Sequence, residues 1–285
     1  MNQLQLVDFT SAPSPCDMVR AADVIVVNSS AGKDSQAMLD YVAELAAEAG
    51  VSDRVTVVHN DLGTTDTGIP IEWPGTADLA RRQAEHYGFP FVITRREKGG
   101  LYQQLRNERL KFPGPGLGRW CTSDQKTSQA MKVVTRLAKE HKRSRGLKVY
   151  SGEPVKVLYC LGLRAQESPG RARKPVIEED HSAWSDLRTV TRWNPILHWT
   201  ETEVWDRIKA SGVPYHPAYD EGMTRLSCSL CVLASRDDLI RAARLRPDLA
   251  AEYAALETEL DHQFRADMSM ADIIAAASER QKEHS

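Results

Sequence analysis

Short apolar runs alternate with longer helix-forming segments through the first half of the chain. The apolar runs are rich in valine and isoleucine, which is typical of strands buried in a parallel sheet. This alternation predicts an α/β fold, a Rossmann-like parallel sheet with helices on both faces. The predicted strands are 24–28, 55–59, 89–93 and 155–161, and the predicted helices between them are 34–49, 77–87 and 122–141.

The second half of the chain has weaker strand signals and stronger helical ones. A Gly- and Pro-rich stretch at 112–118 predicts a loop, because it sustains neither a helix nor a central strand. Residues 171–192 are polar and irregular, so no regular element is predicted there. The remaining helices form a helical C-terminal extension that covers the sheet edge and is not an independent domain. They are predicted at 200–210, 236–243 and 247–264.

Composition places the protein among ordinary globular proteins. Hydrophobic residues make up 41% and charged residues 27% of its 285 residues, and the formal net charge is −2. These values argue against a disordered or fibrous chain. No signal-like segment and no apolar stretch of membrane-spanning length is found, so we expect a cytoplasmic protein without membrane contact. A near-neutral total still leaves room for local basic patches that contact nucleic acid.

A loop of small residues follows the first predicted strand and leads directly into a helix. Backbone N–H groups point outward at such a helix N-terminus, and this arrangement binds phosphate. The loop is not a Walker A motif, which has a longer glycine-bounded loop before its Lys-Ser/Thr pair. Lys33 would supply charge to the phosphate, and Ser30 and Ser35 would donate from their hydroxyls. The candidate nucleotide-binding residues of the loop are Ser30, Ala31, Gly32, Lys33, Asp34 and Ser35.

The loop resembles the PP-loop signature Ser-Gly-Gly-x-Asp-Ser of ATP pyrophosphatases and sulfonucleotide reductases, with Ala31 in place of a glycine. Two further segments resemble the same family: the Asp-x-Gly turn at 61–63 and the element Gly-x-Arg-x-x-Glu-Ser at 162–168. The resemblance implies that Asp61 lies near the adenosine or its magnesium. It also implies that Gly162 and Arg164 lie at the phosphate or sulfate.

The longest resemblance is in the block 193–231, which is similar to the C-terminal block of two groups of proteins. These are the 3'-phosphoadenylyl sulfate (PAPS) and adenylyl sulfate reductases, and the PP-loop subunit of DNA phosphorothioation systems. The chain is thus identified as a member of the PAPS reductase superfamily, with an adenine nucleotide alpha-hydrolase-like fold. The implied organisation is an N-terminal lead at 1–21, a PP-loop nucleotide-binding domain at 22–235 and a helical extension at 236–285.

Five cysteines, an odd number, argue against a disulfide framework. The pair Cys228-x-x-Cys231 suits zinc, an iron–sulfur cluster or a redox dithiol. The segment 119–126 resembles the one that supplies earlier ligands in the iron–sulfur members of the family, which implies a 4Fe-4S cluster held by Cys121, Cys228 and Cys231. Such a cluster takes four cysteines. Cys160 or an exchangeable non-protein ligand is expected to complete it.

The resemblance implies three functions that the residues leave open. In the first, ATP with Mg²⁺ adenylates an acceptor for sulfur transfer, as in DNA phosphorothioation, with Lys33, Asp34 and Arg164 as catalytic residues. Its partners would be a cysteine desulfurase and DNA-modification subunits, with nucleic acid as a possible acceptor. In the second, PAPS or adenylyl sulfate is reduced to sulfite. This needs a nucleophilic thiolate, which relatives carry near the C-terminus, whereas the last cysteine here is Cys231. The third is a nucleotide-binding subunit without catalysis.

Overall fold

A computed structural model describes residues 14–114 and 118–282. Its centre is a six-stranded sheet with the order β3-β2-β1-β4-β6-β5. Neighbouring strands run parallel except β5, which pairs antiparallel with β6 at the edge. The strands are β1 (Val24–Asn28), β2 (Val55–Asn60), β3 (Phe91–Thr94), β4 (Val155–Cys160), β5 (Ile177–Glu179) and β6 (Arg188–Trp193).

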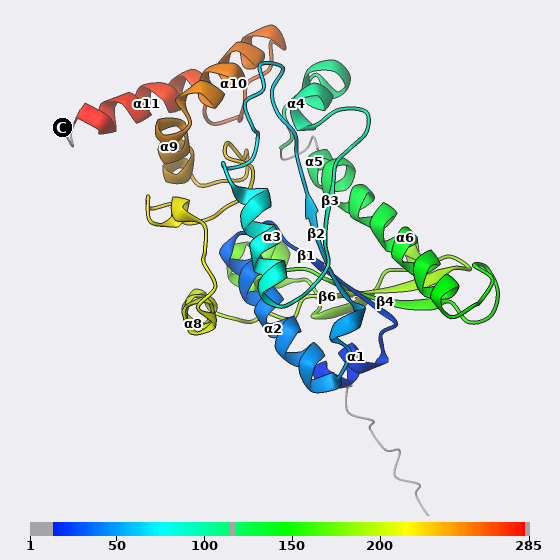
Figure 1. Cartoon of the computed structure of the whole chain (residues 1–285). Helices are drawn as coiled ribbons and strands as arrows, with labels where there is room; N and C mark the ends of the chain where they lie inside the picture. The colour runs from blue at the N-terminus through cyan, green and yellow to red at the C-terminus, as the bar shows by residue number, and fades with distance from the viewer. Residues whose placement is uncertain (1–13, 115–117, 283–285) are drawn as a thin grey trace, which may run out of the picture.

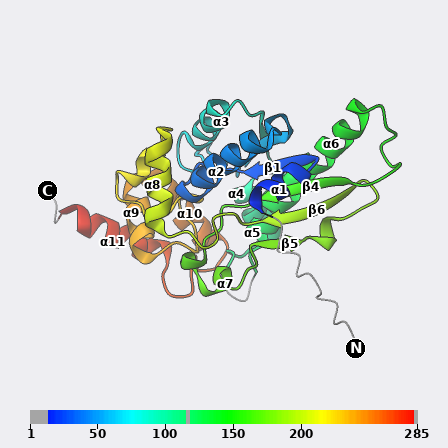
Figure 2. The ribbon, with the colours of Figure 1, turned by 90° about the horizontal axis from the view of Figure 1, so that it is seen from below.

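Helices cover both faces of this sheet (Figures 1 and 2). Alternate residues of β1 show why its apolar run is continuous: Ile25 and Val27 pack on the α2 side, and Val24 and Val26 pack on the α6 side. Helices α1 and α8 join α2 on its side. The helices are α1 (Pro15–Ala21), α2 (Lys33–Ala49), α3 (Thr76–His86), α4 (Leu101–Gln104), α5 (Trp120–Thr122), α6 (Ser128–Ser144), α7 (Pro169–Ala172), α8 (Glu201–Ser211), α9 (Arg236–Leu245), α10 (Pro247–Glu259) and α11 (Met270–Lys282).

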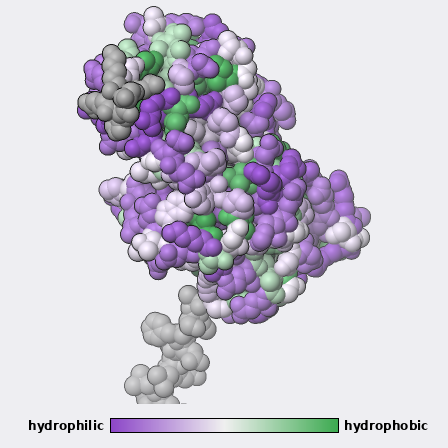
Figure 3. Space-filling model, turned by 60° about the vertical axis from the view of Figure 1, so that its left-hand side comes forward, coloured by the Kyte–Doolittle hydropathy of each residue, from purple (hydrophilic) through white to green (hydrophobic). Residues whose placement is uncertain are grey.

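The last three helices form a separate layer beyond the sheet, in orange and red in Figure 1. Their buried residues share one hydrophobic cluster with Leu62, Ile71 and Trp73 from the segment after β2, and with Leu101 of α4. The C-terminal helices are therefore packed onto the loops that follow the strands. Figure 3 shows a largely hydrophilic surface in which hydrophobic colour is confined to small separate areas.

The structure corrects the predicted elements in the second half of the chain. The stretch 171–192, predicted to be irregular, contributes α7, β5 and most of β6. In β6 only Val190 and Trp193 are buried, so the strand lacks the alternating pattern that would reveal it. The helix predicted from 122 begins at Trp120 and passes through a π-helical turn, Ser123–Thr127, before α6. The helix predicted at 247–264 ends at Glu259, and α11 was not predicted.

Within the described ranges, no helix is both long enough and apolar enough to cross a membrane.

Candidate functional site

A cleft of about 740 Å³ opens at the carboxyl ends of β1, β2 and β4. This edge is where ligands bind in open α/β sheets. Of the residues predicted to bind the nucleotide, Ser30, Ser35 and Gly162 line the cleft. A Cβ atom on Gly162 would come within 2.9 Å of Asp34 O, so only glycine lets β4 approach the phosphate loop this closely.

Hydrogen bonds of its own serines fix the conformation of the loop between β1 and α2. Ser35 Oγ accepts from Ser30 N at 3.2 Å and donates to Gly32 O at 2.9 Å. Ala31 has a φ of 53°, a left-handed conformation in the place where the family pattern has glycine. Gly32 caps α2 without a side-chain hydrogen bond, and Lys33 N donates to the Tyr219 hydroxyl at 2.8 Å, which leaves the N–H groups of Asp34 and Ser35 for an anion. The local backbone is therefore shaped for phosphate.

The charged residues of the same motif point elsewhere. Lys33 is 3% exposed, and its Nζ donates to Thr224 O at 2.5 Å and lies 3.5 Å from Glu201 Oε1. Asp34 forms an ion pair with Arg164, whose side chain is also buried. None of the three predicted catalytic residues lines the cleft. Their catalytic role stays a prediction, because in this structure they fasten neighbouring segments to the loop.

Asp61 is likewise engaged outside the cleft. It accepts from Gly63 N at 2.7 Å and forms an ion pair with Arg95. The residues just before it, His59 and Asn60, line the cleft instead, together with Glu72. Sequence reasoning missed these three. The signal that was available is their position, at the end of β2 and in the segment that follows it.

The buried His59 and the partly exposed Glu72 form a pair at the base of the phosphate loop. His59 Nδ1 lies 2.9 Å from Ser29 O, and Nε2 lies 3.2 Å from Glu72 Oε2. Burial lowers the pKa of His59, but the hydrogen bond and charge of Glu72 outweigh it and raise the pKa above its usual value. A carbonyl oxygen only accepts, so Nδ1 carries a proton. The pair thus places a carboxylate at the β2 end of the cleft.

Cations also line the cleft, and Arg192 of β6 lies beside β4, on the other side of β1 from β2. One of these cations, Arg171, has a strongly lowered pKa. Burial and the nearby Arg225 and Arg119 lower it to about 10, although Glu167 forms an ion pair with Arg171. Glu167 also lies 3.4 Å from Arg225, so the two arginines share one carboxylate. An anionic ligand would relieve this excess positive charge. The cations that line the cleft are Arg119, Lys126, Arg171, Lys174 and Arg192.

Three predicted metal ligands come together beside the cleft. Cys121, Cys228 and Cys231 line a mainly apolar cavity of about 40 Å³, and Arg119 lines both this cavity and the cleft. The Cys228 thiol donates to the Cys231 sulfur, which lowers the pKa of Cys231 and raises that of Cys228. Burial raises the pKa of the Cys121 thiol. Across residues 14–114 and 118–282, however, no His, Cys, Asp or Glu residues form a group of three or more arranged to hold a metal ion.

Cys160, the fourth predicted ligand, is not part of this group. It is completely buried in β4, in the hydrophobic cluster under α2, whereas Cys121 and Cys228 pack against the cluster of the C-terminal helices. Burial alone raises the pKa of its thiol. We therefore correct the predicted ligand set: Cys160 is a core residue of the sheet.

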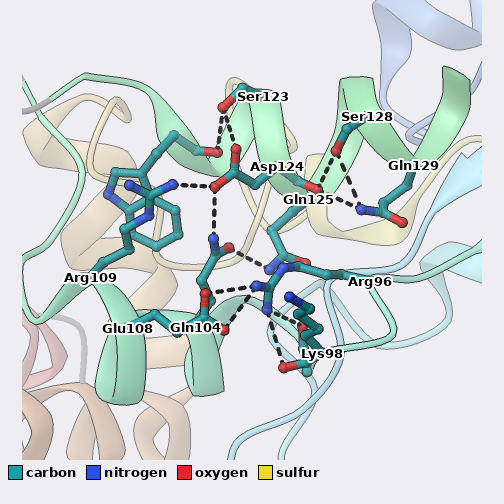
Figure 4. Close-up of polar contacts among 12 residues, drawn as sticks. Arg96, Lys98, Gln104, Glu108, Arg109, Ser123, Asp124, Gln125, Ser128 and Gln129 are labelled. Carbon is teal, nitrogen blue, oxygen red and sulfur yellow. Dashed lines mark hydrogen bonds and ion pairs between the residues drawn. The ribbon is translucent and has the colours of Figure 1, made fainter.

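A polar network holds the helical turn that carries Cys121 (Figure 4). Asp124 accepts from Arg109 Nη2 at 2.5 Å, from Gln104 Nε2 at 2.8 Å and from Ser123 Oγ at 2.7 Å. Gln125 Nε2 donates to Gln104 Oε1 at 2.7 Å. The network joins two π-helical turns, Leu105–Arg109 and Ser123–Thr127, and fixes the orientation of the segment between the cysteine cavity and the cleft.

Backbone and side-chain hydrogen bonds connect the segment that carries Cys228 to Glu72, a residue that lines the cleft. Glu72 and Cys228 form an isolated antiparallel bridge. Arg246 Nη1 donates to Glu72 O at 2.8 Å and to Ser229 Oγ at 2.7 Å. The cysteines are therefore attached through the backbone to a residue whose side chain lines the cleft.

Comparison with known proteins identifies relatives of the sheet-bearing part. An adenosine 5'-phosphosulfate reductase of Neisseria meningitidis is 36% identical over 210 residues, 72% of this chain and 76% of that protein. An uncharacterized 37.8 kDa protein of Escherichia phage 186 is 35% identical over 101 residues, 35% of this chain and 29% of that protein. A phosphoadenosine 5'-phosphosulfate reductase of Gloeobacter violaceus is 34% identical over 71 residues, 25% of this chain and 27% of that protein. The last two matches thus span less than a third of those relatives' own length.

Two solved structures show a weak overall similarity to this chain. The phosphoadenylyl-sulfate reductase of Candida auris has a TM-score of 0.47 at 19% identity, covering 76% of this chain and 88% of that one. The U34-tRNA thiolase NcsA of Methanococcus maripaludis, solved with its 4Fe-4S cluster, has a TM-score of 0.41 at 15% identity, covering 95% and 79%.

The family model of the phosphoadenosine phosphosulfate reductase domain matches residues 24–234, from the first strand to just beyond the cysteine pair. This span contains the phosphate loop, the cleft and the three-cysteine cavity. The chain belongs to the phosphoadenosine phosphosulfate reductase domain family.

Proposed function

We propose that the protein is an ATP pyrophosphatase that adenylates an acceptor for sulfur transfer. The observation that carries this proposal is the position of Arg119, which lines both the cleft and the three-cysteine cavity. A phosphate bound beside Arg119 would lie next to the thiols, so activation of the acceptor and delivery of sulfur would occur at one place. DNA phosphorothioation is the setting that we propose, with nucleic acid as acceptor and a cysteine desulfurase and DNA-modification subunits as partners.

The reaction has two displacements. An acceptor oxygen attacks the α-phosphorus of ATP, a new P–O bond forms, and pyrophosphate leaves with the electron pair of the broken bond. A sulfur nucleophile then attacks the activated acceptor, and AMP leaves. Magnesium enters with the ATP and neutralises part of its charge.

The chain would contribute mainly position and charge to these steps. The N–H groups at the start of α2 and the hydroxyls of Ser30 and Ser35 would hold the phosphates. Arg119 and Arg171 would stabilise the negative charge that develops on the phosphoryl oxygens. Holding acceptor and nucleotide in line accounts for much of the rate in such transfers.

The three thiols match a 4Fe-4S cluster in the chemistry of their donors, because soft thiolates select iron–sulfur clusters and zinc. Cys121, Cys228 and Cys231 would hold the cluster, and a non-protein ligand would complete it. When bound, the cluster would supply a site for sulfur. Lys126 and Arg225 lie close enough to favour thiolates at Cys228 and Cys231, respectively, which is the form that binds metal.

Reduction of adenylyl sulfate or PAPS is the alternative, and the relatives favour it. The Neisseria meningitidis relative, named an adenosine 5'-phosphosulfate reductase, is matched over 76% of its length. The same cleft would hold that nucleotide, with its sulfate directed at Arg119 and the thiols.

One experiment separates these functions. Protein purified without oxygen is given ATP or PAPS in parallel, with double-stranded DNA and sulfide present, and AMP, pyrophosphate and sulfite are measured. AMP and pyrophosphate from ATP are the expected result. Thioredoxin-dependent sulfite from PAPS, without pyrophosphate from ATP, would overturn the proposal in favour of the reductase. Binding of either nucleotide without turnover would leave only a nucleotide-binding subunit.

A further inference from the structure

Asn60 carries an unsatisfied polar atom in the cleft. It is the last residue of β2, and it lines the cleft. Its Oδ1 atom is buried, and no donor in the described part of the chain reaches it. Asn28 lines the same cleft but is fully engaged: Nδ2 donates to Cys160 O at 3.1 Å, and Oδ1 accepts from the Tyr159 hydroxyl at 3.0 Å. A buried carbonyl oxygen without a donor costs free energy, so Asn60 marks a place where a ligand can supply one.

The charges at the two ends of the cleft decide which part of a nucleotide meets Asn60. Arg171, Lys174 and Arg192 line the end beside β4 and β6, where they attract phosphate. The β2 end, on the other side of β1, holds none of these three cations, and its Glu72 carboxylate is paired with His59 and accepts from Leu62 N. With the phosphates at the arginines and the loop, the base of the nucleotide extends to the β2 end, where Asn60 lies.

We infer that Asn60 reads the base of the bound nucleotide. Its Oδ1 accepts a hydrogen bond from an exocyclic amine, and its Nδ2 donates to the adjacent ring nitrogen. Adenine offers that amine and acceptor side by side, which is why asparagine pairs with it in two bonds at once. Asn60 is thus a specificity-determining residue for a 6-aminopurine. The inference rests on the proposed function only in assuming that a nucleotide occupies the cleft.

Paired changes in protein and ligand test this contact. The dissociation constants of ATP and of purine riboside triphosphate, which lacks the 6-amine, are measured by calorimetry for the native protein and for Asn60→Ala. The native protein should bind ATP about tenfold more tightly than the analogue, since a buried oxygen left unpaired costs about that factor. Asn60→Ala should bind the two equally. Asn107→Ala, an exposed asparagine outside the cleft, should keep the native ratio.

A second variant guards against a general loss of fold. Asn60→Asp keeps the size of the side chain but presents only acceptors, which suit the N–H groups of guanine, so the ratio of GTP to ATP affinity should rise about tenfold. An analogue penalty that is identical in native protein and Asn60→Ala, with ATP still bound, would overturn the inference alone. Failure of the native protein to bind ATP would overturn the proposed function as well.

Discussion

The cleft and the three-cysteine cavity adjoin each other, yet they are built from opposite chemistry. The cleft encloses about 740 Å³ and is lined by hydroxyls, amides and cations. The cavity encloses about 40 Å³, and beside its cysteines it is lined mostly by apolar residues such as Leu101, Phe112 and Tyr253. The polar side chains of the cleft suit a charged ligand, whereas the apolar side chains of the cavity lower the polarity around the thiols. Among the residues that the structure describes, Arg119 alone belongs to both sets of lining residues.

Under the proposed function, each region supplies one half of the sulfur-transfer site. The cleft supplies charge and a phosphate-binding backbone, and the cavity supplies thiols. If the two halves carry separate tasks, a change in one should leave the task of the other intact.

We expect Cys231→Ser to have the largest effect on the cavity with the least effect on the cleft. Loss of one of three thiolates should remove bound iron and acid-labile sulfide and abolish sulfur transfer, while the ATP dissociation constant stays within about twofold, because the residue lies outside the cleft. Metal analysis and calorimetry measure the two effects. Cys16→Ser, on the half-buried cysteine of α1, is the matched control and should retain iron. Iron retained by Cys231→Ser would contradict the assignment of the cavity.

The converse change is Arg171→Gln in the cleft. Loss of a charge-assisted contact to phosphate should weaken ATP binding about 10- to 100-fold at fixed salt, with iron content unchanged. Arg173→Gln is a matched control on the same loop, since Arg173 is exposed and does not line the cleft. Equal losses in the two variants would mean that only general charge attracts the nucleotide.

Lys33→Met tests whether the Lys33 side chain binds phosphate or stabilises the fold. Methionine cannot donate to Thr224 O, so the free energy of unfolding should fall by about 2 kcal/mol, while ATP affinity changes less than about threefold. Chemical denaturation and calorimetry test this. Lys142→Met removes a similar buried donor from Ser151 O and Glu153 O, away from the cleft, and should cost about as much stability. A tenfold loss of ATP affinity confined to Lys33→Met would restore its predicted role at the phosphate.

The smallest effect is expected from Ala31→Gly in the phosphate loop. Glycine relieves the left-handed backbone, but it removes a buried methyl group that packs near Leu79 and Ala80 and adds freedom to the unfolded chain. These effects oppose one another, so the free energy of unfolding should change by less than about 1 kcal/mol. ATP affinity should stay within about twofold. A large loss of affinity would show that the methyl group shapes the phosphate site.

The sequence was enough to predict four of the six strands, but not β6 and β5 on one side of the sheet. Strands β1, β2 and β4 were predicted because they are buried on both faces and therefore continuously apolar. Strand β5 at the edge and strand β6 beside it were not predicted, because many of their residues are polar and partly exposed, so hydrogen bonding and not burial defines them. Such pairing depends on contacts with β4 that no local pattern encodes.

For the site, the sequence predicted which residues form the loop better than it predicted where their side chains point. The motif Ser30–Ser35 specifies a backbone turn, and the structure has that turn. It does not specify where Lys33 and Asp34 point, which depends on Thr224 and Arg164 far along the chain. Likewise, spacing indicated the thiols of Cys228 and Cys231 but could not separate the core cysteine Cys160 from a ligand. Asn60 and Glu72 belong to the cleft through strand order alone.

The central claim is that a nucleotide lies in the cleft with its phosphates between the loop and Arg119. A crystal structure with a nonhydrolysable ATP analogue tests it most directly. The account predicts phosphate oxygens within hydrogen-bonding distance of Ser35 and Arg119, with the base beside Asn60. An analogue bound outside the cleft, or with its phosphates at the Glu72 end, would contradict it.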